Sequence, residues 1–387
     1  MNAAPLMEKA RILKKRLTAA WGRSLHPETG MICLRPFYYM NISGNGLVYP
    51  CCPGLVNMPL GTVSYKRTFE SIWNGPAARI FRKTMLSTRL DGVCVRKSCP
   101  FFLNGLLPRQ TGKGLDMTRT APGLFPDGLM DDGAVMSAIR SAASTLDYTP
   151  RFIGLACDRR CNLSCASCRS INVTRLSKEE SAYLDKVTEY LHEAGPNLLE
   201  LEALGSGEVF YSPFTLSLLR SMDRKDFPRL KTHIVTNGQL FTQAMWESLG
   251  PGRGFINRVD VSVDAATKST YEAIRIGGSW ERLTKNLEFI SSLRISKEIG
   301  FFALNFVISA RNFTEIPLFL DMAKNLGADQ VVMTLLHNWG KAMRYEFEKE
   351  AVHFPQHPLH GEFLKTLQKA REQSPNVLLG FSVKKDK

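Results

Sequence analysis

Three cysteines in one short loop are the residues of this 387-residue chain with the most specific chemical potential. Cys161, Cys165 and Cys168 form a C-x3-C-x2-C pattern soon after the apolar run 152–156. Thiolates this close together repel one another and oxidise unless they share a metal centre. Three thiolates leave one iron of a cubane 4Fe-4S cluster open to an outside ligand, whereas a structural zinc ion takes four ligands. The pattern therefore predicts an iron-sulfur centre with an open coordination position.

A zinc site is the alternative for this loop. Cys157, four residues before Cys161, could complete a set of four ligands, and the spacing does not forbid it. The position of the loop favours the open cluster, because catalytic groups of parallel barrels gather on the loops that follow the strands. Cys157 is otherwise expected to be a small buried side chain that ends the first strand.

Alternating strands and helices are predicted after residue 150. Six steps of this kind lack a complete dinucleotide-binding Gly-x-Gly-x-x-Gly motif, since Phe210 stands at the third glycine position. They predict an α/β fold with a partial (β/α)6 parallel barrel, with an open doubly wound sheet as the alternative. The expected strands are 152–156, 198–204, 233–236, 259–263, 301–308 and 330–336, and the expected helices are 178–194, 213–222, 242–249, 280–293 and 314–326.

Five further cysteines precede this region, and a Gly-Asn-Gly turn at residues 44–46 predicts a hairpin with a cysteine beyond each end. Four such thiolates can close around one cluster or one zinc ion, and the spacing does not separate the two. We expect a small α+β cysteine-rich domain over 1–107 with a basic amphipathic leading helix, a linker over 108–149, the barrel over 150–340 and a helical extension over 341–387.

Composition excludes several classes of protein. A hydrophobic content of 44% excludes disorder as the main state, and no run approaches the roughly 18 consecutive apolar residues of a membrane span. The net charge of +14 favours an anionic partner without naming one. Prolines between His353, His357 and His360 block a helix that would align three metal ligands, so we expect a surface loop there.

The cysteine loop resembles the cluster loop of the radical S-adenosylmethionine (radical SAM) superfamily, and the resemblance extends over most of residues 150–340. In that family the open iron binds SAM, and an electron from the cluster cleaves it to methionine and a 5′-deoxyadenosyl radical that abstracts a substrate hydrogen. The resemblance implies that Cys161, Cys165 and Cys168 ligate this cluster. The residue before the third cysteine, usually aromatic or His near the adenine, is Ser167 here.

Further segments resemble the SAM-binding parts of that family in the expected order. The segment 205–208, Gly-Ser-Gly-Glu, resembles a Gly-Gly-Glu motif in which open backbone and a carboxylate receive the SAM amino group. A glycine-rich turn, a solvated Arg275 and a core Asn305 are the ordinary alternatives. The resemblance implies cofactor contacts at Ser167, Ser206, Gly207, Glu208, Asn237, Ser262, Asp264, Arg275 and Asn305, with Ser262 facing the ribose and Arg275 the methionine carboxylate.

The earlier cysteines resemble the opening of a SPASM region, C-x(9–15)-G-x4-C, which binds an auxiliary 4Fe-4S cluster. Such regions normally follow the barrel, whereas this one precedes it, and the dense later run of cysteines for a second auxiliary cluster is absent from this sequence. Zinc remains the alternative metal. The resemblance implies one auxiliary cluster held by Cys33, Cys51, Cys94 and Cys99, with Cys52 as the rival of Cys51.

These resemblances imply a radical SAM oxidoreductase or maturase that acts on a peptide or carbohydrate-type substrate by oxidation, epimerisation or crosslinking. The excess positive charge favours an anionic substrate. Oxygen-sensitive clusters that need a reductant predict a cytoplasmic location with flavodoxin or ferredoxin as partner. The rival from another class is a basic zinc-binding protein that binds nucleic acid, but it leaves the strand–helix repeat and the segment 205–208 unexplained.

Overall fold

A computed structural model describes residues 30–86, 92–96, 99–103, 105–111, 114–118, 120, 124–165, 167–168, 172–203, 206–338, 344–373 and 377–379. The chain divides into two compact units. Unit 1 comprises Met1–Asn41 and Leu47–Arg151, and unit 2 comprises Ile42–Gly46 and Phe152–Lys387. The expected basic leading helix and Gly205 lie outside the described residues.

The sheet of unit 2 holds seven parallel strands, and their order in the sheet follows their order in the chain. A doubly wound sheet reverses its strand order at a switch point, so the described strands confirm the parallel barrel type and not that alternative. The sheet has one strand more than expected, the three-residue β12. The strands are β6 (Phe152–Ala156), β7 (Glu200–Ala203), β8 (Lys231–Thr236), β9 (Ile256–Ser262), β10 (Phe301–Ile308), β11 (Gln330–Leu335) and β12 (Val377–Leu379).

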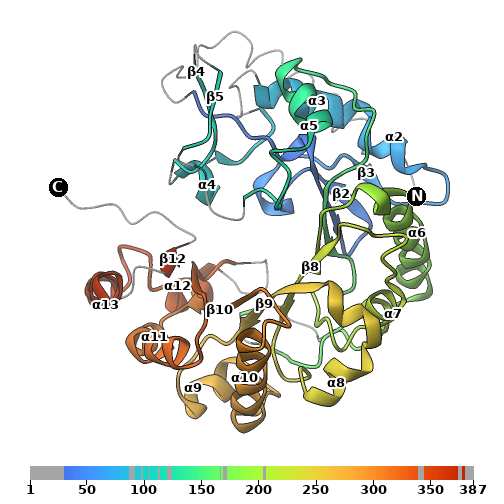
Figure 1. Ribbon diagram of the computed structural model, residues 1–387. Coiled ribbons are helices and arrows are strands. Elements are labelled where there is room, and N and C mark those ends of the chain that lie inside the picture. Colours follow the sequence, from blue (N-terminus) through green and yellow to red (C-terminus); the bar gives the residue numbers. More distant parts are fainter. Residues whose placement is uncertain are drawn as a thin grey trace. The chain divides into compact units, whose positions relative to one another are not determined.

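Helices follow the outer face of this sheet (Figure 1). Burial alternates along β10, where Leu304 and Phe306 are fully buried while Asn305 and Val307 are partly exposed. One face of the sheet therefore forms the core, and the other is open to polar side chains. The helices are α6 (Lys178–Ala194), α7 (Pro213–Ser221), α8 (Gln243–Ser248), α9 (Lys268–Ile274), α10 (Trp280–Ile295), α11 (Ile316–Asn325), α12 (Arg344–Glu350) and α13 (His360–Gln373), with short 3-10 helices η6 (Gly195–Asn197), η7 (Gly250–Phe255) and η8 (Phe313–Glu315).

Side-chain caps fix where several of these helices begin. Ser177 and Glu180 form a reciprocal capping box at α6, and Ser212 caps α7. Caps of this kind satisfy backbone N–H groups that have no partner inside the helix. Thr242, Thr267 and Ser279 do the same for α8, α9 and α10.

Unit 1 is a small α+β domain, as the sequence predicts. Its strand β2 pairs antiparallel with β3, and β4 pairs antiparallel with β5. The elements are η2 (Arg35–Phe37), β1 (Tyr39–Ser43), β2 (Leu47–Tyr49), η3 (Pro53–Leu55), β3 (Gly61–Thr62), α2 (Phe69–Trp73), α3 (Pro76–Leu86), α4 (Pro100–Leu103), β4 (Arg109–Thr111), β5 (Gly114–Asp116) and α5 (Gly133–Arg140).

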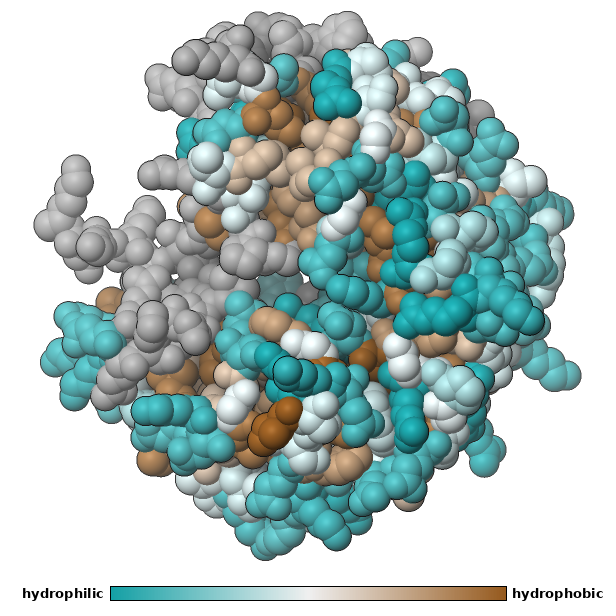
Figure 2. Space-filling model, in the orientation of Figure 1, coloured by the Kyte–Doolittle hydropathy of each residue, from teal (hydrophilic) through white to brown (hydrophobic). Residues whose placement is uncertain are grey.

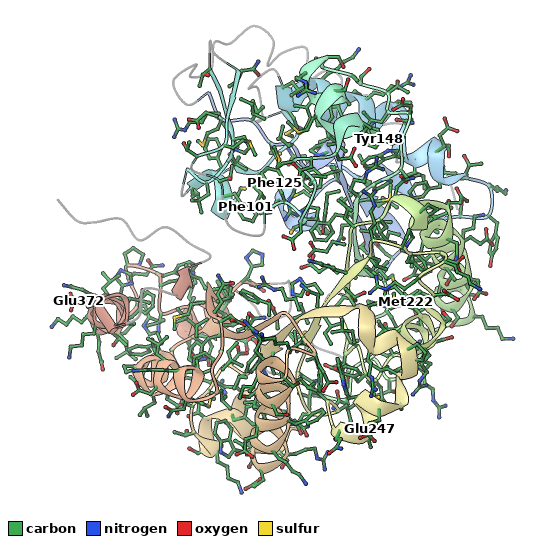
Figure 3. All side chains as sticks on the ribbon, viewed as in Figure 1. Phe101, Phe125, Tyr148, Met222, Glu247 and Glu372 are labelled. Carbon is green, nitrogen blue, oxygen red and sulfur yellow. The ribbon has the colours of Figure 1, made fainter. Side chains whose placement is uncertain are left out.

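The segment 108–149, expected as a linker, is instead part of unit 1. Tyr148, labelled in Figure 3, donates its hydroxyl to Phe37 O at 3.1 Å, and its own carbonyl accepts from Trp73 Nε1 at 2.7 Å. Val135 of α5 is fully buried. Its turn-rich composition reflects loops that fold back onto the domain, so the linker expectation is wrong.

The expected extension 341–387 likewise belongs to unit 2. Phe363 of α13 is buried, and its ring centroid lies 6.3 Å from that of Phe313. Within the described residues, no helix has both the length and the apolar character of a transmembrane segment. On the visible face of unit 2, hydrophobic residues lie in small groups among hydrophilic ones (Figure 2).

Candidate functional site

Asp158 holds the cysteine loop where it leaves β6. Its buried carboxylate accepts hydrogen bonds from Arg160 Nε at 3.0 Å and Nη2 at 2.5 Å, and from Ser212 Oγ at 2.5 Å. Burial opposes ionisation, but these donors lower the pKa of Asp158, so the group is charged at neutral pH. Because Ser212 caps α7, Asp158 ties the loop to that helix. Asp158 is missed at the level of sequence, although its place between two cysteines is a signal.

The three thiols of the loop differ in exposure. Cys165 is buried, Cys161 is partly exposed and Cys168 is exposed. Cys161 Sγ accepts from Leu163 N at 3.4 Å and lies 3.9 Å from Asn237 Nδ2. Within the described residues, no three Cys, His, Asp or Glu side chains are grouped closely enough to hold a metal ion. The loop therefore carries the three cysteines without forming a finished ligand set, and metal binding would order it.

Cys157 lies apart from these three thiols in its chemistry. It is 2% exposed, and burial raises the pKa of its thiol to about 12, which keeps it protonated at neutral pH. Tyr183 donates its hydroxyl to Cys157 O. These features match the expected small side chain at the end of the first strand.

The turn that follows β7 packs directly on the backbone of the cysteine loop. Ser206 Oγ donates to Ala156 O at 2.7 Å and to Asp158 O at 3.1 Å. A Cβ atom at Gly207 would lie only 2.4 Å from Arg160 O, so a side chain cannot fit there. The approach of the two loops therefore requires glycine at position 207.

Glu208 joins the ends of β7 and β8. Its buried carboxylate accepts from Thr236 Oγ1 at 2.6 Å, Asn237 N at 2.7 Å and Phe210 N at 3.2 Å. Burial outweighs these donors and raises the pKa of Glu208. A carboxylate has about four acceptor positions, so an ammonium group could still bind.

Asp264 and Arg275 form a buried ion pair beside the cysteine loop. Asp264 has a left-handed backbone with φ +65°, and its Oδ2 lies 2.7 Å from Arg275 Nη2. Arg275 Nη1 lies 3.7 Å from Cys165 Sγ. Burial alone would lower the pKa of Arg275, but the charges of Asp264 and Cys165 raise it. Arg275 is thus a buried cation next to a cysteine and not a solvated side chain.

Two polar atoms near this site have no hydrogen-bond partner among the described residues, namely Arg275 Nε and Asn305 Oδ1. Asn305 on β10 lies in register with Ser262 on β9. Buried polar groups are nearly always satisfied, so these orphaned atoms suit a polar ligand. Asn237 Nδ2 donates to Asn162 Oδ1 at 2.9 Å, and Ser167 lies partly buried next to Cys168 in the loop.

A charged network occupies the open face of the sheet and is also missed at the level of sequence. His233 on β8 lies 3.4 Å from Glu202 on β7 and 3.2 Å from Asp260 on β9. Arg258 Nε donates to Asp260 at 2.7 Å. Burial opposes its charge, yet His233 and Arg258 lower the pKa of Asp260 to about 2. Asp260 precedes Ser262 on the same face of β9, so the network extends the polar lining below the SAM-binding positions.

A separate pocket in unit 1 gathers four of the earlier cysteines. Cys33 packs with Phe101 and Phe125, which Figure 3 labels, against a small hydrophobic cluster. Burial raises the pKa of Cys33 to about 11, so a metal at its sulfur would have to displace a proton. Cys52 is exposed and does not line the pocket. The lining residues are Cys33, Pro36, Pro50, Cys51, Leu55, Val56, Phe81, Met85, Cys94, Arg96, Cys99, Phe102 and Leu107.

Comparison with known proteins matches both sites. Residues 157–309 match the family model described as the radical SAM superfamily, and residues 33–100 match that of SPASM, an iron-sulfur cluster-binding domain. The chain belongs to the radical SAM superfamily. Its radical SAM domain is of the type that binds a 4Fe-4S cluster and SAM, and its SPASM domain, which binds auxiliary iron-sulfur clusters, precedes it as expected.

Two named relatives are enzymes. The chain is 27% identical over 180 residues to the AdoMet-dependent heme synthase of Methanosarcina barkeri (strain Fusaro / DSM 804), covering 46% of this chain and 48% of that protein. It is 27% identical over 201 residues to the PqqA peptide cyclase of Gluconobacter oxydans (strain 621H), covering 51% and 52%. The chain thus matches about half the length of these curated relatives.

Solved structures are also similar to this chain. One is the crystal structure of Streptococcus suis SuiB bound to precursor peptide SuiA, at 13% identity and a TM-score of 0.43. The match covers 90% of this chain and 72% of that chain.

Proposed function

We propose that this radical SAM protein cleaves SAM reductively and abstracts a hydrogen atom from a peptide substrate. The observation that carries the proposal is the meeting of the Cys161–Cys165–Cys168 loop with the buried Glu208 carboxylate and the buried Arg275 guanidinium. When bound, the cluster and SAM supply a 5′-deoxyadenosyl radical. The chain's own residues bind and orient the cofactor and shield it from water.

Each predicted contact has a role that its surroundings support. Cys161, Cys165 and Cys168 are the cluster ligands, and Arg275 and Asn237 place N–H donors near two of their sulfurs. Hydrogen bonds to cluster sulfurs favour the anionic centre. Glu208 receives the SAM amino group with its remaining acceptor position. The orphaned Nε of Arg275 receives the methionine carboxylate while Asp264 holds that guanidinium in place.

The other positions line the nucleoside part of the cofactor. Ser262 faces the ribose, and the orphaned Oδ1 of Asn305 on the neighbouring strand accepts a hydrogen bond from the ligand. Ser206 and Gly207 bring open backbone close to the cluster loop. Ser167 replaces the ring that usually lies near the adenine, so we expect a weaker contact on that side.

A peptide is the proposed substrate because one relative is named as a peptide cyclase. We propose that the four-cysteine pocket of unit 1 holds the auxiliary 4Fe-4S cluster through Cys33, Cys51, Cys94 and Cys99, since Cys52 does not line that pocket. Such a cluster can accept one electron from a substrate radical, which favours oxidation or crosslinking as the net reaction. A flavodoxin or ferredoxin is the proposed source of the electron for SAM cleavage.

Anaerobic reconstitution with iron counting and a 5′-deoxyadenosine assay under dithionite tests the proposal. We expect about eight irons per chain, on the stoichiometry of two cubane clusters. Simultaneous Ala replacement of Cys161, Cys165 and Cys168 should abolish SAM cleavage and leave about four irons. Cys157→Ala, which removes a buried thiol outside the ligand set, is the matched control and should retain both clusters. SAM cleavage that survives the triple replacement, or stoichiometric zinc in the loop, would refute the proposal.

A further inference from the structure

Arg35 is a cation in unit 1 with no matching anion. It begins the short helix η2, two residues after Cys33. Its guanidinium carbon lies 4.5 Å from the ring centroid of Tyr39 and 5.5 Å from that of Phe101. Arg35 Nε is buried without a hydrogen-bond partner, and Arg35 forms no ion pair with a described carboxylate.

A buried positive charge without an anion is unfavourable, and aromatic rings offset only part of that cost. The anionic groups that can act on Arg35 are cysteines and tyrosines. Burial alone would lower the pKa of Arg35, whereas Cys51 and the neighbouring Tyr38, Tyr39 and Cys52 raise it. In return, the guanidinium lowers the pKa of Cys33 and Cys99 against the effect of burial. The electrostatic partners of Arg35 therefore include three of the four cysteines that line the pocket.

We propose that Arg35 is the counter-charge of the auxiliary cluster, which stabilises the bound centre and favours its reduced form. This inference rests on the proposed function, in particular on the assignment of the four-cysteine pocket to a 4Fe-4S cluster. Four thiolates give such a centre a net negative charge, and reduction adds one more. A fixed positive charge in a poorly solvated site favours the more negative state.

The consequence for the reaction is directional. In the proposed oxidation or crosslinking, the substrate radical loses one electron and the auxiliary cluster gains it. A higher midpoint potential of that cluster makes this transfer more favourable. Arg35 thus acts as a positioning and tuning residue, since it acts through the cluster and not on the substrate.

The test isolates the auxiliary cluster in the background that carries the Ala replacements of Cys161, Cys165 and Cys168. Its midpoint potential is measured by redox titration followed by electron paramagnetic resonance. Arg35→Gln should lower the reduced-to-oxidised ratio at a fixed potential about tenfold, which is a downward shift of about 59 mV for one electron. Arg35→Lys, which keeps the charge, should stay close to the parent. Arg79→Gln, which removes an exposed charge from the same unit, is the matched control.

The outcomes separate the explanations. A potential of Arg35→Gln equal to that of the parent overturns the inference. If Arg35→Gln fails to retain iron while Arg35→Lys and Arg79→Gln retain it, the need for a positive charge is supported. Loss of iron from Arg35→Lys as well would assign Arg35 a role in shape and overturn the inference. Zinc in the pocket would also overturn it, and the 5′-deoxyadenosine assay on the parent chain would still report separately on the radical SAM site.

Discussion

A single hydrogen atom in place of a side chain decides how closely two loops of the site approach. An added Cβ at Gly207 would meet two backbone oxygens, Arg160 O at 2.4 Å and Asp158 O at 2.5 Å. Backbone oxygens in a loop held by Asp158 cannot move away without disturbing the cysteines. The need for glycine here is therefore steric, because no side chain fits between the loops.

Gly207→Ala should lower the rate of SAM cleavage by about 10²-fold, since a displacement of about 1 Å at a positioned site has effects of that size. The measurement is 5′-deoxyadenosine formation under dithionite. Gly361→Ala is the control, because an added Cβ there meets nothing within 4 Å and the position lies in helix α13. Equal rates for the two variants would contradict the steric account of position 207.

Sequence spacing identifies the residues of the site that contact each other along the chain, and it fails for those that meet through the fold. Glu208 and Arg275 follow from their motif positions, and the structure gives both a buried environment beside the loop. Asp158, Thr236 and Ser212 are ordinary residues in the sequence. Their roles depend on the close approach of three strand ends, which no local pattern encodes.

At the scale of elements, two helix caps with the same residue type do different work. Ser177 caps α6 on the surface, where its Oγ accepts from Glu180 N at 3.1 Å. Ser212 caps α7 through Thr215 N at 3.0 Å, and its hydroxyl also donates to the buried carboxylate of Asp158. The cap of α7 is therefore coupled to the cysteine loop, while that of α6 is not bonded to Asp158.

Ser177→Ala should reduce the free energy of unfolding by about 1 kcal/mol, the usual value of a cap. Ser212→Ala should reduce it by about 2 to 4 kcal/mol, because it also removes a hydrogen bond to a charged group. Urea unfolding of both variants measures the difference. Only Ser212→Ala should also slow SAM cleavage. Equal losses of stability would show that Asp158 does not depend on the cap.

Periodicity predicts the elements of unit 2 well where they are long. The expected 152–156, 178–194 and 301–308 coincide with β6, α6 and β10. It misses β12, because three residues are too few to show a period. It also takes 108–149 for a linker, because glycine and proline mark turns equally in linkers and in domains that are held by buried aromatic residues such as Tyr148.

At the scale of the whole molecule, the net charge of +14 says little about the site. The open face of the sheet carries Glu202, Asp260, Arg258 and His233 in one network, so charges of both signs lie where a substrate would approach. The preference for an anionic substrate therefore stays a prediction from composition alone. Local pairing, and not the sum of charges, sets the field there.

Histidines near the end of unit 2 link its stability to pH. The sequence predicts a surface loop there, and turns do precede α13, but His353 is partly buried with its ring centroid 4.6 Å from that of Phe354. Its Nδ1 has no partner, whereas His357 Nε2 and His360 Nδ1 each lie 3.0 Å from a backbone oxygen. Burial, aided by His360, His337 and His357, lowers the pKa of His353 to about 4.

The unfolded chain then binds one more proton than the folded chain at this residue between about pH 4 and the ordinary value of about 6.5. Stability from this group is present above about pH 6.5 and falls as the pH drops toward 4. His353→Gln should flatten the dependence of the urea midpoint on pH between about 7 and 5 relative to the parent chain. His192→Gln, which removes a histidine that is 47% exposed, is the control. Parallel curves for the parent and His353→Gln would mean that another group carries the acid sensitivity, because only a proton taken up on unfolding can produce the slope.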